Sequence, residues 1–337
     1  MNEIELTKKL IEIESVSGNE TEILEFLADF LRENSTEVWQ NKDFAAGVLR
    51  IRTNGNEFSK SSRAIILTGH IDTVSAGDLR AWKKSPWEAT GMNGKIIGLG
   101  ASDMKGGLAA QFIAGLEFVK ENNFESNFDL WLVAVSNEEI DGRGSRNFVK
   151  WLNEQKEFDY SEFFGVIAEP TNCENIEIGH RGNRFVRLKF KGESGHASQQ
   201  ANFQKSALSK ASFFLSQIND ILGSPSLVTT SLKSGEDKSP NKTAPSAELI
   251  LDIRTTPELD SDFKNAFNLL AEKYDFKWEY HSEPVPSSLV SKKSRVIENI
   301  LKVSKLNEES IMVSPGATDQ GEFVNGLKNA QIVVFGP

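Results

Sequence analysis

Cysteine is almost absent from this sequence: Cys173 is the only one among 337 residues. A single cysteine excludes an internal disulfide framework and is typical of a reducing cytoplasm. No apolar run approaches the ~18 residues that a membrane-spanning helix needs. The first residues also lack the basic start and apolar stretch of a secretory signal. We therefore expect a cytoplasmic protein that does not associate with membranes.

The sequence has fewer basic than acidic residues. The chain has 38 Lys and Arg against 48 Asp and Glu, which gives a net charge of −10 and a pI near 5.2. This balance argues against nucleic acid or an anionic membrane as a partner. The hydrophobic content of 39% and charged content of 26% are those of a globular protein, and the length suits two domains.

The periodicity of apolar residues predicts an α/β fold in the first half of the chain. Four helices are predicted, at residues 3–13, 22–33, 106–120 and 144–152. Three buried strands are predicted, with apolar runs at residues 64–67, 130–136 and 165–168. A capping box is expected before the second helix, either Asn19 with Glu22 or Ser17 with Glu20. Buried strands that alternate with helices indicate a sheet whose site lies at the carboxyl edge of the strands.

The pattern changes in the second half. Residues 184–190 and 247–253 alternate between apolar and polar, which predicts half-exposed antiparallel strands. Amphipathic helices are expected near residues 203–222 and 258–273. We therefore predict an inserted α+β domain at 180–293 within a catalytic domain formed by 1–179 and 294–337. The last apolar strand, 331–335, should rejoin the first sheet.

Ionisable residues follow the predicted strands. His70 and Asp72 lie two positions apart and share one face of an extended chain. This pattern is typical of a metal-ligating imidazole whose tautomer is fixed by a carboxylate, although the carboxylate could act on a neighbouring segment instead. Taken alone, such a pair is more often a surface pair or a core histidine. The glycine-rich residues 98–103 are not a dinucleotide fingerprint, because Asp103 stands at the third glycine position.

Eight motifs occur in an order that resembles a known family. They are GHIDTV, GLGASDMKGG, NEEIDGRGS, AEPT, GHRGN, GESGHAS, NKTAPSAELILDIR and GATDQGEF. They resemble the motifs of the di-zinc amidohydrolases and metallopeptidases typified by succinyl-diaminopimelate desuccinylase. Acetylornithine deacetylase and glutamate carboxypeptidase belong to the same family. Each motif is weak alone, but eight in order from His70 to Pro337 are specific.

The resemblance implies a role for each matching residue. The metal ligands would be His70, Asp103, Glu139 and Glu169, with Asp103 bridging two Zn²⁺ ions, for which Co²⁺ can substitute. Asp72 would orient the ring of His70, and Glu138 would be the general base on the water between the zincs. The peptide bond between Asp103 and Met104 would be cis.

The inserted domain corresponds to the family's lid and dimerisation domain. By resemblance, His196 would reach the partner subunit's site to stabilise the oxyanion. Asn241 and Arg254 would hold the substrate, with the guanidinium on a carboxylate, although Arg254 could equally pair with Asp252 or Glu248 on the surface.

In the family, the chain continues beyond an FGP motif, here residues 335–337, to a histidine that is the last zinc ligand, and this chain ends at Pro337. We therefore expect the chain, as a C-terminally truncated member, to hold one metal tightly and the second weakly, with low activity. The strand 331–335 should also lack a covering helix and expose apolar surface.

The sequence predicts a homodimeric, zinc-dependent hydrolase of the desuccinylase or deacetylase type. Its substrate would be a small N-acylated amino acid or peptide, cleaved next to a free carboxylate. The alternative is a catalytically weakened family member that acts as a binding protein.

Overall fold

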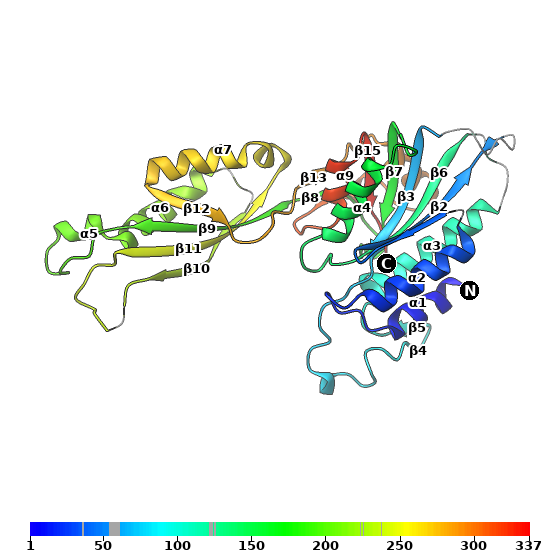
Figure 1. Ribbon diagram of the computed structural model, residues 1–337, viewed down its shortest axis with the longest axis horizontal. Coiled ribbons are helices and arrows are strands. Elements are labelled where there is room, and N and C mark those ends of the chain that lie inside the picture. Colours follow the sequence, from blue (N-terminus) through cyan, green and yellow to red (C-terminus); the bar gives the residue numbers. More distant parts are fainter. Residues whose placement is uncertain are drawn as a thin grey trace. The chain divides into compact units, whose positions relative to one another are not determined.

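The computed structural model describes residues 1–35, 37–53, 61–120, 124, 126–222, 224, 226–236 and 238–337. Two compact units form within it (Figure 1). Unit 1 comprises Met1–His180 and Ser288–Pro337, and unit 2 comprises Arg181–Ser287. Each unit has its own sheet and its own hydrophobic core.

A sheet of nine strands forms the centre of unit 1 in the part of the chain that the structure describes. Along one path the order is β1 (Glu37–Gln40), β2 (Phe44–Ile51), β6 (Phe128–Val135), β3 (Arg63–His70), β7 (Glu162–Ile167), β15 (Ala330–Val334), β8 (Ile176–His180) and β13 (Ser288–Leu289), while β14 (Ile311–Ser314) pairs with β8. Strands β6, β3, β7 and β15 run parallel, whereas β1 and β2 are antiparallel. The predicted α/β fold with a mixed, mainly parallel sheet is confirmed.

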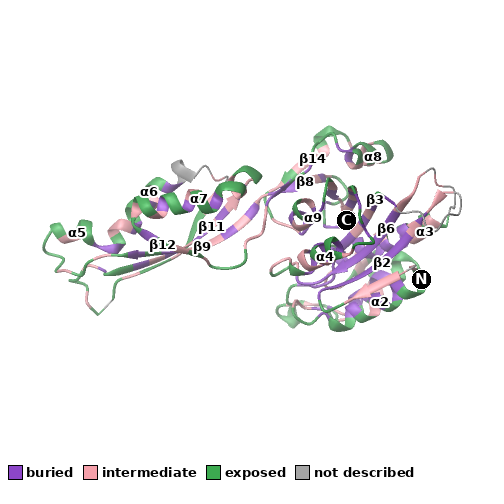
Figure 2. Cartoon of the chain, turned by 45° about the horizontal axis from the view of Figure 1, so that its top comes forward, coloured by how far each residue is buried: buried purple, intermediate pink, exposed green. Residues whose placement is uncertain are grey.

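Helices cover both faces of this sheet. They are α1 (Glu3–Glu12), α2 (Thr21–Asn34), α3 (Gly106–Val119), α4 (Arg143–Glu154), α8 (Arg295–Val303) and α9 (Gln320–Gly326). Because neighbouring strand residues point to opposite faces, Leu132 of β6 packs with α1, α2 and α3, and Val133 packs with α4 and α9. The central strands are accordingly buried, and the helices keep exposed outer faces (Figure 2).

The two N-terminal helices form as predicted, but the capping box before α2 does not. Glu20 precedes α2 and makes no side-chain cap; its carboxylate instead accepts a hydrogen bond from the backbone N–H of Gly18 at 2.8 Å. The hydroxyl of Ser17 is bound to a residue distant in sequence. A capping box forms at α1 between Asn2 and Glu5.

The C-terminal strand rejoins the sheet as predicted, since β15 pairs with β7 in parallel. The expectation that it would expose apolar surface is wrong. Ile332, Val333 and Val334 are at most 1% exposed, because α8 and α9 pack against this strand. Elsewhere in unit 1 a small hairpin joins β4 (Thr90–Met92) to β5 (Lys95–Ile97).

Unit 2 is an antiparallel sheet in the order β10 (Ser226–Ser234), β11 (Ser246–Thr255), β9 (Gly182–Lys191) and β12 (Phe276–Tyr280). The face with Val186, Leu188 and Phe190 is buried under α6 (Ala207–Leu222) and α7 (Pro257–Tyr274). The predicted helix 203–222 is divided, because Ser206 is extended between α5 (Ala201–Lys205) and α6. Among the described residues, the chain folds into no helix with the length and apolar character to span a bilayer.

Candidate metal centre

Three neighbouring parallel strands of unit 1 deliver ionisable side chains to one edge of the sheet. His70 is the last residue of β3, Glu138 and Glu139 follow β6, and Glu169 follows β7. The carboxyl ends of adjacent parallel strands meet at the same edge, so these side chains converge there. They converge because of strand order, although they are far apart in sequence.

Asp103 comes from another element, the irregular turn at Ala101–Lys105 that precedes α3. Gly100 enters this turn at φ 78°, where a Cβ atom would lie 2.8 Å from Cγ2 of Thr73. Both the left-handed backbone and the close approach require glycine. The bond between Asp103 and Met104 is cis, which confirms the expectation from the sequence. Asp103 Oδ1 lies 3.0 Å from His70 Nε2.

The four predicted metal ligands and the predicted base, Glu138, fall into two groups that share His70. Ligand atoms of His70, Asp103 and Glu139 lie within 4.8 Å of one another, as do those of His70, Glu138 and Glu169. Glu169 Oε1 is 3.6 Å from His70 Nε2. One imidazole among several carboxylates is a donor set that suits zinc and similar divalent ions.

The electrostatics of the cluster also fit a cation. Burial raises the pKa of Glu138 well above its usual range, and burial raises the pKa of Glu169 and Glu139. Burial alone would lower the pKa of His70, but hydrogen bonds with Asp103 and Glu169 raise it well above its usual range. Clustered carboxylates are costly to ionise together, and a divalent cation among them would offset their repulsion.

The ring of His70 is oriented for binding through Nε2. Its Nδ1 lies 2.9 Å from the backbone oxygen of Asp72. A carbonyl oxygen can only accept a hydrogen bond, so Nδ1 carries a proton. The opposite nitrogen, Nε2, then faces the carboxylates of Asp103 and Glu169, and a cation bound there would displace any proton on it.

The carboxylate of Asp72 acts mainly on a neighbouring segment, which is the alternative that the sequence left open. It is fully buried, and its Oδ1 is 3.6 Å from His70 Nδ1. Its oxygens accept hydrogen bonds from the backbone N–H groups of Glu138 at 3.2 Å and Glu139 at 3.3 Å. Oδ2 also accepts from the hydroxyl of Ser17 at 2.7 Å. Asp72 therefore positions the two glutamates more directly than the ring.

Sequence reasoning gave no role in the centre to three residues that lie beside it. Ser17 is described above. Asp319 is 3% exposed, burial raises its pKa to about 8, and its charge contributes to the raised pKa of Glu138. Lys105 donates from Nζ to the backbone oxygens of Leu10 and Ile13, at 2.8 and 3.1 Å. Asp319 and Lys105 could have been noticed from the sequence, because they lie in the motifs GATDQGEF and GLGASDMKGG. No such motif distinguished Ser17.

The predicted residues of the inserted domain lie in unit 2. His196 is exposed, and its Nδ1 lies 2.8 Å from the hydroxyl of Ser198. Asn241 is next to it, since its backbone oxygen accepts from the N–H of Ala197 at 2.8 Å. Arg254, on β11, pairs with Asp252 at 3.2 Å.

The other two histidines have partners outside the centre. His180 is 2% exposed, and its Nε2 accepts from the N–H of Gly321 at 3.0 Å. His281 lies with Nδ1 2.8 Å from Nη2 of Arg187. Both are held by local contacts in their own units.

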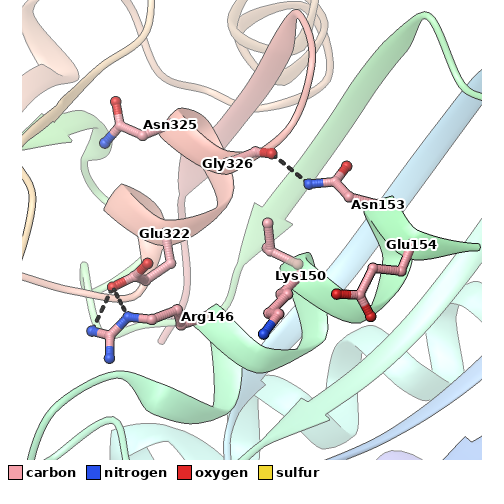
Figure 3. Close-up of a pocket in the computed structure, with 8 residues that line it drawn as sticks. Arg146, Lys150, Asn153, Glu154, Glu322, Asn325 and Gly326 are labelled. Carbon is pink, nitrogen blue, oxygen red and sulfur yellow. Dashed lines mark hydrogen bonds and ion pairs between the residues drawn. The ribbon is translucent and has the colours of Figure 1, made fainter.

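Helices α4 and α9, which begin beside the centre, are joined at the surface. Nη2 of Arg146 in α4 lies 2.8 Å from Oε1 of Glu322 in α9, and Nδ2 of Asn153 donates to the backbone oxygen of Gly326 at 2.9 Å (Figure 3). These contacts line a surface pocket of about 530 Å³ that none of the predicted site residues lines. They fix α9 against α4, and with it Asp319 at the start of α9.

Comparison with known proteins gives a family match over most of the chain. The sequence profile of peptidase family M20/M25/M40 matches residues 66–337. A succinyl-diaminopimelate desuccinylase of Aliarcobacter butzleri (strain RM4018) is 28% identical over 323 residues, which cover 90% of this chain and 84% of the relative.

Solved structures share the fold. The aminopeptidase PepT from Bacillus cereus ATCC 10987 superimposes with a TM-score of 0.72 at 16% identity, over 99% of this chain and 89% of that one. A Bacillus subtilis protein described as a dinuclear metal binding peptidase from the M20 family gives a TM-score of 0.67 at 15% identity, over 99% and 88%.

Proposed function

Since this chain belongs to peptidase family M20/M25/M40, we propose that it is a zinc-dependent amidohydrolase that cleaves an N-acyl amide or peptide bond next to a free carboxylate. The observation that carries this proposal is the convergence of His70 with several acids at the carboxyl edge of the sheet. A hydrolase of this family needs a bound cation, a base and a means of selecting its substrate, and the chain offers residues for each.

The metal would be held by His70, Asp103, Glu139 and Glu169. When bound, zinc polarises the scissile carbonyl and lowers the pKa of water. Of the acids in the cluster, we assign Glu138 as the general base. Its carboxylate would take a proton from the attacking water and later give it to the leaving nitrogen.

The inserted domain, expected at 180–293 from the sequence and overlapping unit 2 (Arg181–Ser287), would supply the lid and the dimer contact. We propose that His196 stabilises the oxyanion in the partner subunit's site, and that Asn241 and Arg254 bind the substrate. A homodimer is supported by edge strand β10, where Val228 and Leu232 are 54% and 46% exposed. Exposed apolar side chains on an edge strand favour pairing with another strand.

The desuccinylase from A. butzleri makes a succinylated amino acid the first substrate class to test. The work of the enzyme would then be small-molecule metabolism in the cytoplasm, where the exposed thiol of Cys173 would stay reduced.

The test is turnover of the zinc-loaded protein on a panel of N-succinyl and N-acetyl amino acids and dipeptides. Each substrate is paired with a version whose free carboxylate is converted to an amide. We expect hydrolysis of carboxylate substrates and a strong preference over their amides. Arg254→Ala should raise KM for the carboxylate substrate and leave KM for the amide unchanged, because only the carboxylate pairs with the guanidinium. Tight zinc binding without turnover on the whole panel would contradict the enzyme assignment and favour the binding protein.

A further inference from the structure

The carboxylate of Asp72 joins three segments of unit 1 that are distant in sequence. Asp72 follows β3. Its carboxylate accepts hydrogen bonds from the backbone N–H groups of Glu138 and Glu139, which follow β6, and from the hydroxyl of Ser17, which lies between α1 and α2. We propose that Ser17 is a positioning residue, which holds Asp72 in the orientation that fixes the backbone of both glutamates. This inference rests on the proposed function, because Glu138 and Glu139 have the roles of base and ligand there.

The segment that carries Ser17 is fixed to the chain that follows β3. Val16 and Thr73 form a parallel bridge, in which the N–H of Thr73 donates to Ser15 and the N–H of Ser17 donates to Thr73, at 3.0 and 3.1 Å. The hydroxyl of Ser15 donates to the backbone oxygen of Ile71 at 2.7 Å. These contacts hold the backbone of Ser17 beside Asp72 without its hydroxyl.

The hydroxyl of Ser17 has one proton, and its closest acceptor is Oδ2 of Asp72 at 2.7 Å; the backbone oxygen of Thr73 is farther, at 3.4 Å. The two backbone bonds to Asp72 are longer, at 3.2 and 3.3 Å. Bonds to a carboxylate strengthen as they shorten, so the hydroxyl is the strongest restraint on rotation of this carboxylate. Without it, the N–H of Glu139 is the one donor that Oδ2 keeps among the residues that the structure describes.

Rotation of Asp72 would move both glutamates together, since they are consecutive in one turn. The turn begins at Asn137, which has φ 59° and whose backbone oxygen accepts from the N–H groups of Asp141 and Gly142 at 3.2 and 2.9 Å. These bonds close the turn on itself. The hydrogen bonds from the N–H groups of Glu138 and Glu139 to Asp72 attach this part of the turn to the end of β3, beside His70.

The experiment compares three variants of the full chain. Ser17→Ala removes the donor, Ser17→Thr retains a hydroxyl, and Ser15→Ala removes a buried hydrogen bond of the same length from the same segment without touching Asp72. Each zinc-loaded protein is measured for kcat and KM, for zinc affinity by chelator competition, and for deuterium exchange of the peptide that contains residues 137–142. Thermal unfolding reports the purely structural effect.

We expect Ser17→Ala to lose about 10- to 100-fold in zinc affinity or kcat, as is usual when a group that orients a metal site is removed. KM should stay near that of the wild type, and exchange in 137–142 should be faster. Ser17→Thr should recover most of these values. Ser15→Ala should lower the unfolding temperature and leave zinc affinity, kcat and exchange in 137–142 unchanged.

Two results would overturn the inference. One is wild-type zinc affinity and wild-type exchange in Ser17→Ala, and the other is the same losses in Ser15→Ala as in Ser17→Ala, which would mean that docking of the segment matters and the hydroxyl does not. If the wild type hydrolyses nothing on the panel, the proposed function fails. Zinc affinity and exchange then still decide the role of Ser17.

Discussion

Replacement of Asp72 by Asn tests the architecture of the centre with the smallest change of shape. The carboxylate accepts from the hydroxyl of Ser17 and from the N–H groups of Glu138 and Glu139. An amide of the same size offers one oxygen that accepts and one NH₂ group that only donates. The variant therefore exchanges an acceptor for a donor at a fully buried position.

The cost follows from the two orientations of the amide. If NH₂ replaces Oδ1, it faces the N–H of Glu138, and if it replaces Oδ2, it faces the N–H of Glu139. The hydroxyl of Ser17 can turn to accept, but a backbone N–H cannot. One N–H loses its acceptor in either orientation, and since a hydrogen bond to a charged group contributes about 1.5–3 kcal/mol, the unfolding free energy should fall by about that amount. Displacement of the two glutamates should also lower kcat by about 10- to 100-fold.

The assay is urea unfolding of the metal-free protein, followed by kcat of the zinc-loaded protein. Tryptophan fluorescence reports mainly unit 1, because of the six tryptophans only Trp278 lies in unit 2. Asp129→Asn is the matched control. Asp129 is 2% exposed, lies 2.6 Å from Nη1 of Arg52 and accepts from the hydroxyl of Tyr160 at 2.7 Å. Its carboxylate is at the opposite end of β6 from the glutamates.

Breaking a buried ion pair costs about 3–5 kcal/mol, so Asp129→Asn should be less stable than Asp72→Asn. It should nevertheless keep the kcat of the wild type under conditions in which it is folded. If Asp72→Asn stays within about 0.5 kcal/mol of the wild type and keeps its kcat, the assignment of Asp72 is wrong. Equal losses of kcat in both variants would show that general destabilisation, rather than the position of the glutamates, explains the effect.

Three further predictions concern the chemistry. Glu138→Gln should lower kcat by about 10²–10⁴-fold with unchanged zinc content, because an amide keeps the shape but cannot take a proton; near-normal kinetics would refute its role as base. Chelation should abolish activity, and Zn²⁺ or Co²⁺ should restore it; activity that survives complete removal of metal would exclude the metal mechanism. A mixture of His196→Ala and Glu138→Gln protomers should regain part of the activity that each lacks, since one site of each mixed dimer is intact. No recovery, with subunit exchange demonstrated, would mean that His196 acts within its own chain.

The parts of the fold that the sequence predicted are those with a strong local signal. Strands β3, β6 and β7 are continuous apolar runs between helices, and α1 and α2 have clear apolar stripes. Strand β9 was predicted because apolar and polar residues alternate along it, and in the structure buried positions alternate with more exposed ones. Strands β1 and β10 were missed because neither shows such alternation: β1 is half-buried throughout, and most of β10 is exposed. Their pairing with β2 and β11 comes from contacts that the local sequence does not contain.

The same distinction applies to the centre. His70, Asp103, Glu138, Glu139 and Glu169 could be predicted because they lie in motifs that resemble those of the family. In the structure, strand order brings the histidine and the three glutamates to one edge of the sheet. Ser17 could not be predicted, because its partner is 55 residues away. The local pattern around it instead favoured a capping box, and the structure shows that no side chain caps α2. A short polar side chain can satisfy either role, and only the folded chain decides between them.

Asp72 shows why the residues that contact a ligand are an incomplete description of this centre. The sequence indicated a carboxylate that orients a ring, yet the ring is held by the backbone oxygen of the same residue. Its carboxylate is free to act elsewhere, on the two N–H groups of Glu138 and Glu139 and on Ser17. The family profile begins at Ile66, so Ser17 lies outside the matched region although it contacts a residue within it. A comparison of family members restricted to residues 66–337 would therefore include the proposed base and metal ligands. It would leave out the hydrogen bond from Ser17 that orients Asp72.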